Sequence, residues 1–255
     1  MDAEFTELSY GFAFTHELIN NSIGIENAAV FPSQIAEGRE GGGYDMEIQL
    51  SGYPLFIQFK LSEYMISSSA NEWHLYNQPY YRFKIRSHKK SQQHDLLLQL
   101  EDEMNNVFYV APEFWKLIEL NQFFMKEEIL YNSAFFRPSS IGTINDDNEH
   151  SIVFQRHSTY GYFCSNPTQL KIERSKILRM NFDKENFLSD KESFINFGIK
   201  MINITKDIFS SKKIYEYYLK KLYDAPNQTI SLLSRLLFNC EFFLMDRLHL
   251  IGQNR

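Results

Sequence analysis

The residues whose chemistry stands out are polar and lie in two neighbouring segments of the chain: Asp45, Glu47, Gln58 and Lys60. In residues 44–51 and 55–62 every second side chain is apolar, which is typical of β-strands. Alternate side chains of a strand project from the same face, so the two carboxylates share one face and the amide and the ammonium share another. A short turn separates the segments and predicts a hairpin, in which we expect the four polar groups to meet.

This combination of groups suits hydrolysis of a phosphodiester bond. Such a reaction uses a hard divalent cation on oxygen ligands, and Asp45 is the obvious ligand. A lysine at position 60 can stabilise the developing negative charge or orient the attacking water. The alternative is a solvated sheet face with ordinary cross-strand pairs. That alternative explains the alternation equally well, but it explains less well the glycine run at 41–43 beside Asp45.

The tripeptides GYD at 43–45 and QFK at 58–60 resemble the motif of the PD-(D/E)XK restriction-endonuclease-like nuclease superfamily. Glutamine in the second acidic position resembles its Mrr-like branch, and the resemblance covers residues 4–112. It implies a mixed sheet flanked by helices, Mg²⁺ (or Mn²⁺) as cofactor and cleavage of DNA. It also implies that Asp45 binds the metal, that Gln58 belongs to the metal shell and that Lys60 is the catalytic lysine.

The same branch carries an acidic residue on its first helix, and here two residues compete for that role. Glu7 lies at the start of the predicted helix and Glu17 near its end, and ten residues of separation prevent them from sharing one face. We favour Glu7. Glu47 departs from the pattern and is a candidate for the missing carboxylate. Gln93 opens a later predicted helix and is a weaker catalytic candidate, because polar residues are common in a first helical turn.

The periodicity of the whole chain predicts an α/β (α+β mixed sheet) protein. We expect a restriction-endonuclease-like core at 1–112, a small β-rich elaboration on it at 113–180 and a C-terminal helical lobe at 181–255. The expected elements are a helix at 4–20, the hairpin, a strand at 81–85, a helix at 91–104, a strand at 107–110, a helix at 113–131, short β-runs at 135–163 and helices after 183, including a buried or partner-facing helix at 230–251.

The composition limits how the chain can meet nucleic acid. A net charge of −6 in 255 residues excludes coating of DNA through bulk positive charge, so any contact must be local. The best local candidates for phosphate contacts form a basic cluster, although a solvated loop explains them about as well: Lys84, Arg86, Lys89 and Lys90.

Two distant cysteines, an acidic N-terminus and the charges within 230–251 predict a cytoplasmic protein that does not enter the membrane.

These observations predict a metal-dependent nuclease that acts on DNA. The resemblance adds that such a chain can be the effector of a restriction or antiphage defence system. The alternative, from a different class, is a non-catalytic subunit that keeps the nuclease fold. Its C-terminal helices would dock a partner ATPase or sensor, or a second copy of the chain.

Overall fold

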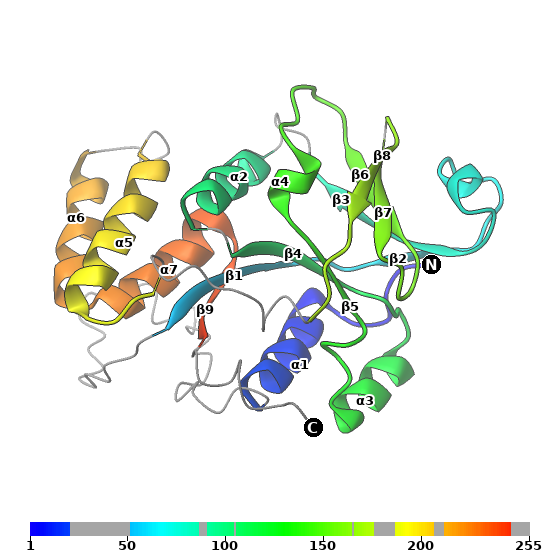
Figure 1. The fold of residues 1–255 in the computed structure, drawn as a ribbon, viewed down its shortest axis with the longest axis horizontal. Coiled ribbons are helices and arrows are strands. Elements are labelled where there is room, and N and C mark those ends of the chain that lie inside the picture. The colour runs from blue at the N-terminus through cyan, green and yellow to red at the C-terminus, as the bar shows by residue number, and fades with distance from the viewer. Residues whose placement is uncertain are drawn as a thin grey trace.

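The computed structural model describes residues 1–20, 52–86, 91–104, 106–164, 166–175, 187–206 and 212–245 (Figure 1). The predicted strand at 44–51, with Asp45 and Glu47, lies outside these residues, as do Lys89 and Lys90. The helices are α1 (Glu7–Asn20), α2 (Gln93–Met104), α3 (Leu117–Lys126), α4 (Pro138–Ile141), α5 (Lys191–Ile204), α6 (Lys212–Asp224), α7 (Pro226–Phe238) and the 3₁₀ turn η1 (Trp73–Leu75). The strands are β1 (Tyr53–Phe59), β2 (Glu63–Met65), β3 (Tyr80–Ile85), β4 (Val107–Pro112), β5 (Ser133–Phe136), β6 (His150–Phe154), β7 (Tyr160–Cys164), β8 (Thr168–Lys171) and β9 (Glu241–Met245).

A mixed four-stranded sheet with the order β5-β4-β1-β9 forms the centre of the molecule. β1 and β4 are parallel, and α2 lies between them in the chain, as a parallel pair requires. β5 and β9 flank this pair in the antiparallel direction. The predicted α+β class with a mixed sheet is therefore confirmed, as are the expected helix at 91–104 and the strands at 81–85 and 107–110.

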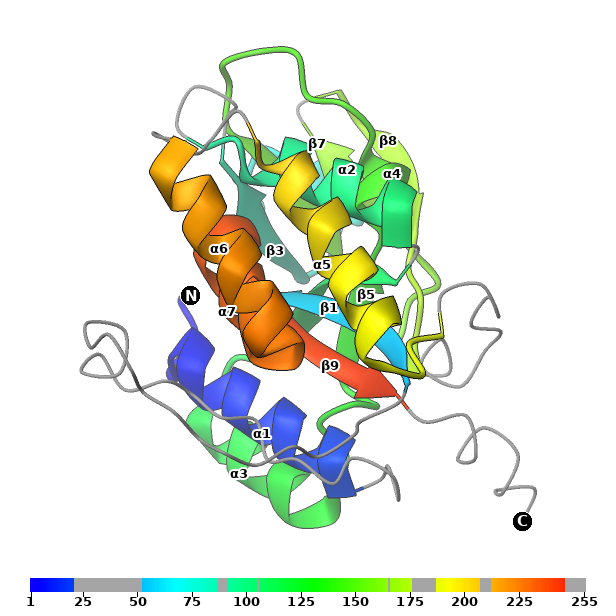
Figure 2. The same cartoon turned by 90° about the vertical axis from the view of Figure 1, so that its left-hand side faces the viewer.

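Helices cover both faces of this sheet. α1 and α3 lie on one face, whereas α2, α5 and α7 lie on the other (Figures 1 and 2). Leu55 and Ile57 of β1 pack into the cluster with α1, and Phe56 packs into the cluster with α2, α5 and α7. All seven residues of β1 are consequently buried, so the alternative of a solvated polar face does not hold for the described part of this strand.

A second, antiparallel sheet with the order β2-β3-β6-β7-β8 packs beside the first (Figure 1). Its inner face adds Phe83 and Phe154 to the core cluster that contains Phe136 of β5 and Tyr109 of β4. Strands from all three predicted segments contribute to the first sheet, because β1 and β4 lie within 1–112, β5 within 113–180 and β9 within 181–255.

The prediction of one helix across 230–251 is wrong. α7 ends at Phe238, and Asn239 adopts a left-handed conformation with φ of 50° that stops the helix. The chain then forms β9, whose residues Phe242, Phe243 and Leu244 pair with β1 instead of extending a helical surface. Of the segment expected to form one buried or partner-facing helix, residues 230–238 belong to α7 and residues 241–245 form an edge strand of the central sheet.

Candidate active site

A cavity of about 270 Å³ opens where β1 ends, between the start of α1 and the turn from α7 into β9. Three elements far apart in the sequence meet there, and their order in space is visible in Figure 2. The residues that line the cavity are Glu7, Ile57, Phe59, Arg235, Asn239, Cys240 and Glu241. Of the residues expected in the site, Glu7 is thus placed directly at the cavity. Gln58 does not line it, although both of its neighbours do, because alternate side chains of β1 project from opposite faces.

The side chains of Glu7 and Lys60 interact electrostatically at this end of β1. Desolvation raises the pKa of the Glu7 carboxyl, whereas the charges of Lys60 and Arg86 oppose that rise. Burial lowers the pKa of the Lys60 ammonium, and the charge of Glu7 partly restores it. The Lys60 Nζ atom also lies 5.6 Å from the centre of the Tyr109 ring. The carboxylate and the lysine that the motif assigned to one site are therefore close enough to shift each other's titration.

Gln58 is the most unusual member of the group, because only 1% of it is exposed. Its Oε1 atom is fully buried and accepts no hydrogen bond within the described chain. An unpaired buried amide oxygen costs free energy, so such atoms in folded proteins call for a ligand, a water or an ion as explanation. Gln58 thus offers an oxygen ligand beside Lys60.

One basic residue beside β3 interacts with the same groups. Lys84 is exposed on β3, and Arg86 follows that strand, exposed, and acts electrostatically on both Glu7 and Lys60. Of the predicted phosphate-binding cluster, Arg86 is therefore the member that lies near the candidate site.

Two further charged residues of the cavity were missed in the sequence. The Nε and Nη2 atoms of Arg235 donate to one oxygen of Glu241, Oε2, at 3.0 and 2.8 Å. Neither residue stands near the motif in the chain, and no spacing in the sequence connects them with Gln58 or Lys60. The buried thiol of Cys240 interacts electrostatically with Lys60 and Glu241, and burial raises its pKa.

The side chains of Gln93 and His94, at the start of α2, make hydrogen bonds within the fold. The Gln93 Nε2 amide donates to the carbonyl of Phe238 at 3.3 Å, which ties the start of α2 to the end of α7. His94 donates through Nε2–H to the Gly142 carbonyl at 2.7 Å, so its Nδ1 accepts from the Tyr109 hydroxyl at 2.9 Å. Gln93 is accordingly a structural contact, and its amide group does not face the cavity.

Glu17 is not brought to the site. Its Oε2 atom accepts hydrogen bonds from the backbone amides of Ile129 and Leu130, at 2.5 and 3.2 Å, and so fixes the chain after α3 to α1. Of the two acids weighed on the first helix, the structure places Glu7 at the cavity and uses Glu17 in packing.

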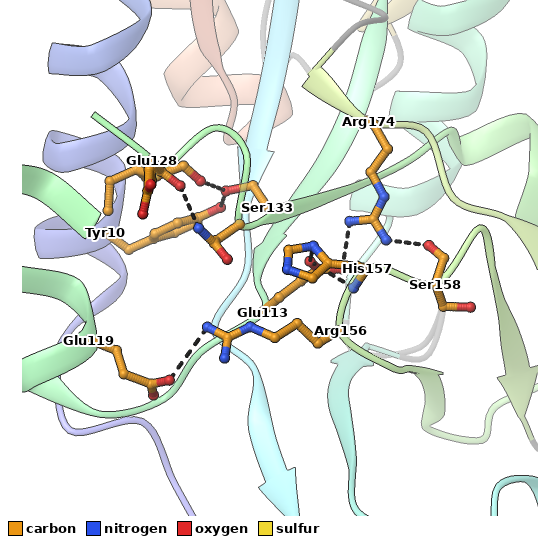
Figure 3. A network of polar contacts seen from close by, with 11 residues as sticks. Tyr10, Glu113, Glu119, Glu128, Ser133, Arg156, His157, Ser158 and Arg174 are labelled. Carbon is orange, nitrogen blue, oxygen red and sulfur yellow. Dashed lines mark hydrogen bonds and ion pairs between the residues drawn. The ribbon is translucent and has the colours of Figure 1, made fainter. Parts of the chain in front are cut away.

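A second polar network connects β4 with the loops beside β6 and β8 (Figure 3). The Glu113 carboxylate is completely buried and accepts from the Arg174 Nη1 atom at 2.6 Å and from the His157 amide at 3.1 Å. Nearby, the Tyr10 hydroxyl donates to Ser133 Oγ at 2.7 Å, because Ser133 itself donates to the Ile129 carbonyl. Each of these groups is satisfied by its neighbours, so the network is structural.

Among the described residues, no group of three or more His, Cys, Asp or Glu side chains is arranged to hold a metal ion. Asp45 and Glu47, the carboxylates of the predicted metal set, lie outside those residues. The described helices include none that is both long enough and apolar enough to cross a membrane.

A scan of protein-family models and searches of curated proteins and of solved structures found no match for this chain.

Proposed function

We propose that the cavity at the end of β1 is the active site of a metal-dependent nuclease that hydrolyses phosphodiester bonds in DNA. The observation that carries the proposal is the unpaired, buried Oε1 of Gln58, two residues before Lys60, which Glu7 influences electrostatically. These are the groups that the Gln-x-Lys motif and its helical acid would bring together. An ordinary cross-strand pair leaves no reason to bury an amide oxygen without a partner.

The proposal gives each residue a separate role. Glu7, Gln58 and Asp45 would hold Mg²⁺ or Mn²⁺, with Glu47 as a further acid. When bound, such an ion polarises the phosphoryl group and lowers the pKa of a coordinated water. Lys60 places a positive charge beside the reacting phosphate and stabilises the negative charge that grows on its oxygens. Arg86 and Lys84 attract the phosphates of the substrate strand.

A second candidate is the non-catalytic subunit with a nuclease-like fold. Large apolar side chains are exposed on α6, at the outer side of the helical layer in Figure 1, and on α7. A partner ATPase or sensor would dock on them: Ile214, Tyr217, Tyr223 and Leu236. This candidate needs no intact metal set and predicts no cleavage.

Cleavage of plasmid DNA with Mg²⁺ separates the two candidates. We expect Lys60→Ala and Asp45→Ala to lower the cleavage rate by about 100-fold or more, because each removes a group that acts on the reacting phosphate. Lys171→Ala is the matched control, since Lys171 is an exposed lysine on β8 whose side chain is 75% accessible. Equal activity of the wild type and both site variants would rule out the nuclease and favour the binding subunit.

A further inference from the structure

We propose that the protein self-associates head to tail, with α6 of one copy docked on the exposed apolar surface of α1 and α3 of the next copy. The inference does not depend on the nuclease function. It names a second copy of the chain as the occupant of two surfaces that the fold of one copy leaves exposed.

The first surface lies on α1 and α3. These helices lie side by side, because a Glu4 oxygen accepts a hydrogen bond from the Leu117 amide at 2.9 Å and the His16 and Phe124 rings lie 4.9 Å apart. Large apolar side chains of both helices are 47–81% exposed, and we call them the α1–α3 face: Leu8, Phe12, Leu117, Ile118 and Met125. Clustered exposed apolar side chains on a folded domain mark an interaction site.

The second surface lies on α6, which packs on α5 and α7 on the opposite side of the central sheet from α1 and α3 (Figure 2). Tyr217 of α6 is 46% exposed. The positions three and four residues before and after Tyr217 share its side of the helix, and all four are exposed: Lys213, Ile214, Lys220 and Lys221. The Lys221 Nζ atom lies 5.0 Å from the centre of the Tyr217 ring. This α6 face therefore surrounds an aromatic side chain with three cations.

The charges of the two faces are complementary. Residues 1–20, which include α1, contain four acidic residues and no lysine or arginine. Residues 116–128, which include α3, contain two lysines and three glutamates, one of which, Glu119, pairs with Arg156. Helix α6 contains four lysines, one glutamate and one aspartate. Two α6 faces would repel each other, as would two α1–α3 faces, so charge selects the pairing of unlike faces.

Sedimentation velocity of the full-length protein over a series of concentrations tests this pairing. We expect the wild type to sediment faster as its concentration rises, because a contact between unlike faces leaves one face free on each outer copy. Phe12→Ser and Tyr217→Ser each remove an aromatic side chain from one face, and each should weaken association by about tenfold or more. Tyr160→Ser is the matched control, because Tyr160 is an exposed tyrosine on β7, outside both faces. It should associate like the wild type.

A mixture of the two variants makes the test specific. The α6 face is intact in Phe12→Ser and the α1–α3 face is intact in Tyr217→Ser, so an equimolar mixture should form a two-copy complex that grows no further. Added salt should weaken this complex, since it screens the unlike charges across the contact. Circular dichroism of each variant confirms that the proteins compared are folded.

A wild type that stays monomeric at every concentration would overturn the inference, and so would a mixture as dissociated as either variant alone. Association that Tyr217→Ser weakens and Phe12→Ser does not would remove the α1–α3 face from the contact, and α6 would then dock on another surface. None of these results bears on Lys60-dependent cleavage of DNA, which tests the proposed function separately.

Discussion

The Lys60 ammonium is placed where its charge is costly. The residue follows β1, is only partly accessible, and lies near the Tyr109 ring, and desolvation is the largest influence on its titration. Glu7 offsets part of that cost, whereas Arg86 adds to it. Charged groups kept in unfavourable surroundings are concentrated at functional sites, where stability is given up for activity.

The burial of Lys60 predicts a dependence of stability on pH. Its pKa in the folded state lies below 10.5, so at neutral pH the unfolded chain holds this proton more tightly than the native protein does. We expect Lys60→Met to unfold at higher urea concentration than the wild type at pH 7. The difference should shrink as the pH rises through the window between the lowered folded pKa and 10.5. Urea unfolding from pH 7 to pH 10 measures it, and two curves that stay parallel would contradict the desolvation account.

Part of the site could be predicted from sequence because its signals are local. The Gln-x-Lys spacing follows from the period of a strand, and Glu7 follows from its place at the start of a helix. Glu241 and Arg235 could not be found in this way, since Glu241 reaches the cavity only through the pairing of β9 with β1, where its partner Ile57 is 184 positions away, and Arg235 reaches it from α7. Burial of Gln58 was missed for a similar reason. Its polarity left a solvated face open as the alternative, but α5 and α7 cover that face of the sheet.

At the level of elements, β9 shows why the C-terminal segment was misassigned. A short apolar run such as Phe242–Leu244 fits the inside of a helix as well as a strand, and periodicity alone does not separate the two. The available signal was Asn239, a residue tolerant of the left-handed conformation that ends α7. Helices and strands with long, regular patterns, such as α1, α2 and β4, were found close to their observed positions.

The ladder between β1 and β9 makes a prediction that separates packing from hydrogen bonding. The amides of Phe56 and Lys60 donate towards β4, so Leu55 and Ile57 turn their backbone groups towards β9. Phe243 faces Leu55 and is 94% buried. We expect Phe243→Ala to lower the free energy of unfolding by about 3 kcal/mol through lost packing. Phe243→Pro should cost about 1–3 kcal/mol more, because the Leu55 carbonyl also loses its donor.

Chemical denaturation of the two variants, compared with the wild type, measures both steps. The alanine variant is the control for the proline variant, since both lack the ring and only proline lacks the amide. Equal stability of the two variants would mean that β9 is held by side chains alone.

At the scale of the molecule, the two sheets share one core, and the central sheet takes strands from every predicted segment. The α+β fold class could be predicted because the periodicity of apolar residues in each segment indicates whether that segment forms a helix or a strand. The order of the strands could not, because β5 and β9 join β4 and β1 through contacts between residues distant in the chain. This arrangement connects the proposed active site to the last strand of the described chain.

The net negative charge of the whole molecule limits where DNA can bind. A chain with a net charge of −6 repels a polyanion at long range, so binding must rest on a few cations at the approach to the site. Lys84 is exposed on β3, and we expect Lys84→Ala to weaken DNA binding at low salt. The slope of log affinity against log salt should fall in magnitude by about 1, the value for one lost phosphate contact.

Fluorescence anisotropy of labelled DNA in metal-free buffer, over a series of salt concentrations, measures this slope without cleavage. Lys171→Ala is the control, because Lys171 lies on β8 at the opposite edge of the same sheet, three strands from β3. We expect it to leave the slope unchanged. An equal reduction in both variants would mean that DNA lies across the whole outer sheet, whereas no reduction in either would place the phosphates elsewhere than on β3. If only Lys84→Ala reduces the slope, the bound DNA strand lies along the end of β3, past Arg86 and towards Lys60.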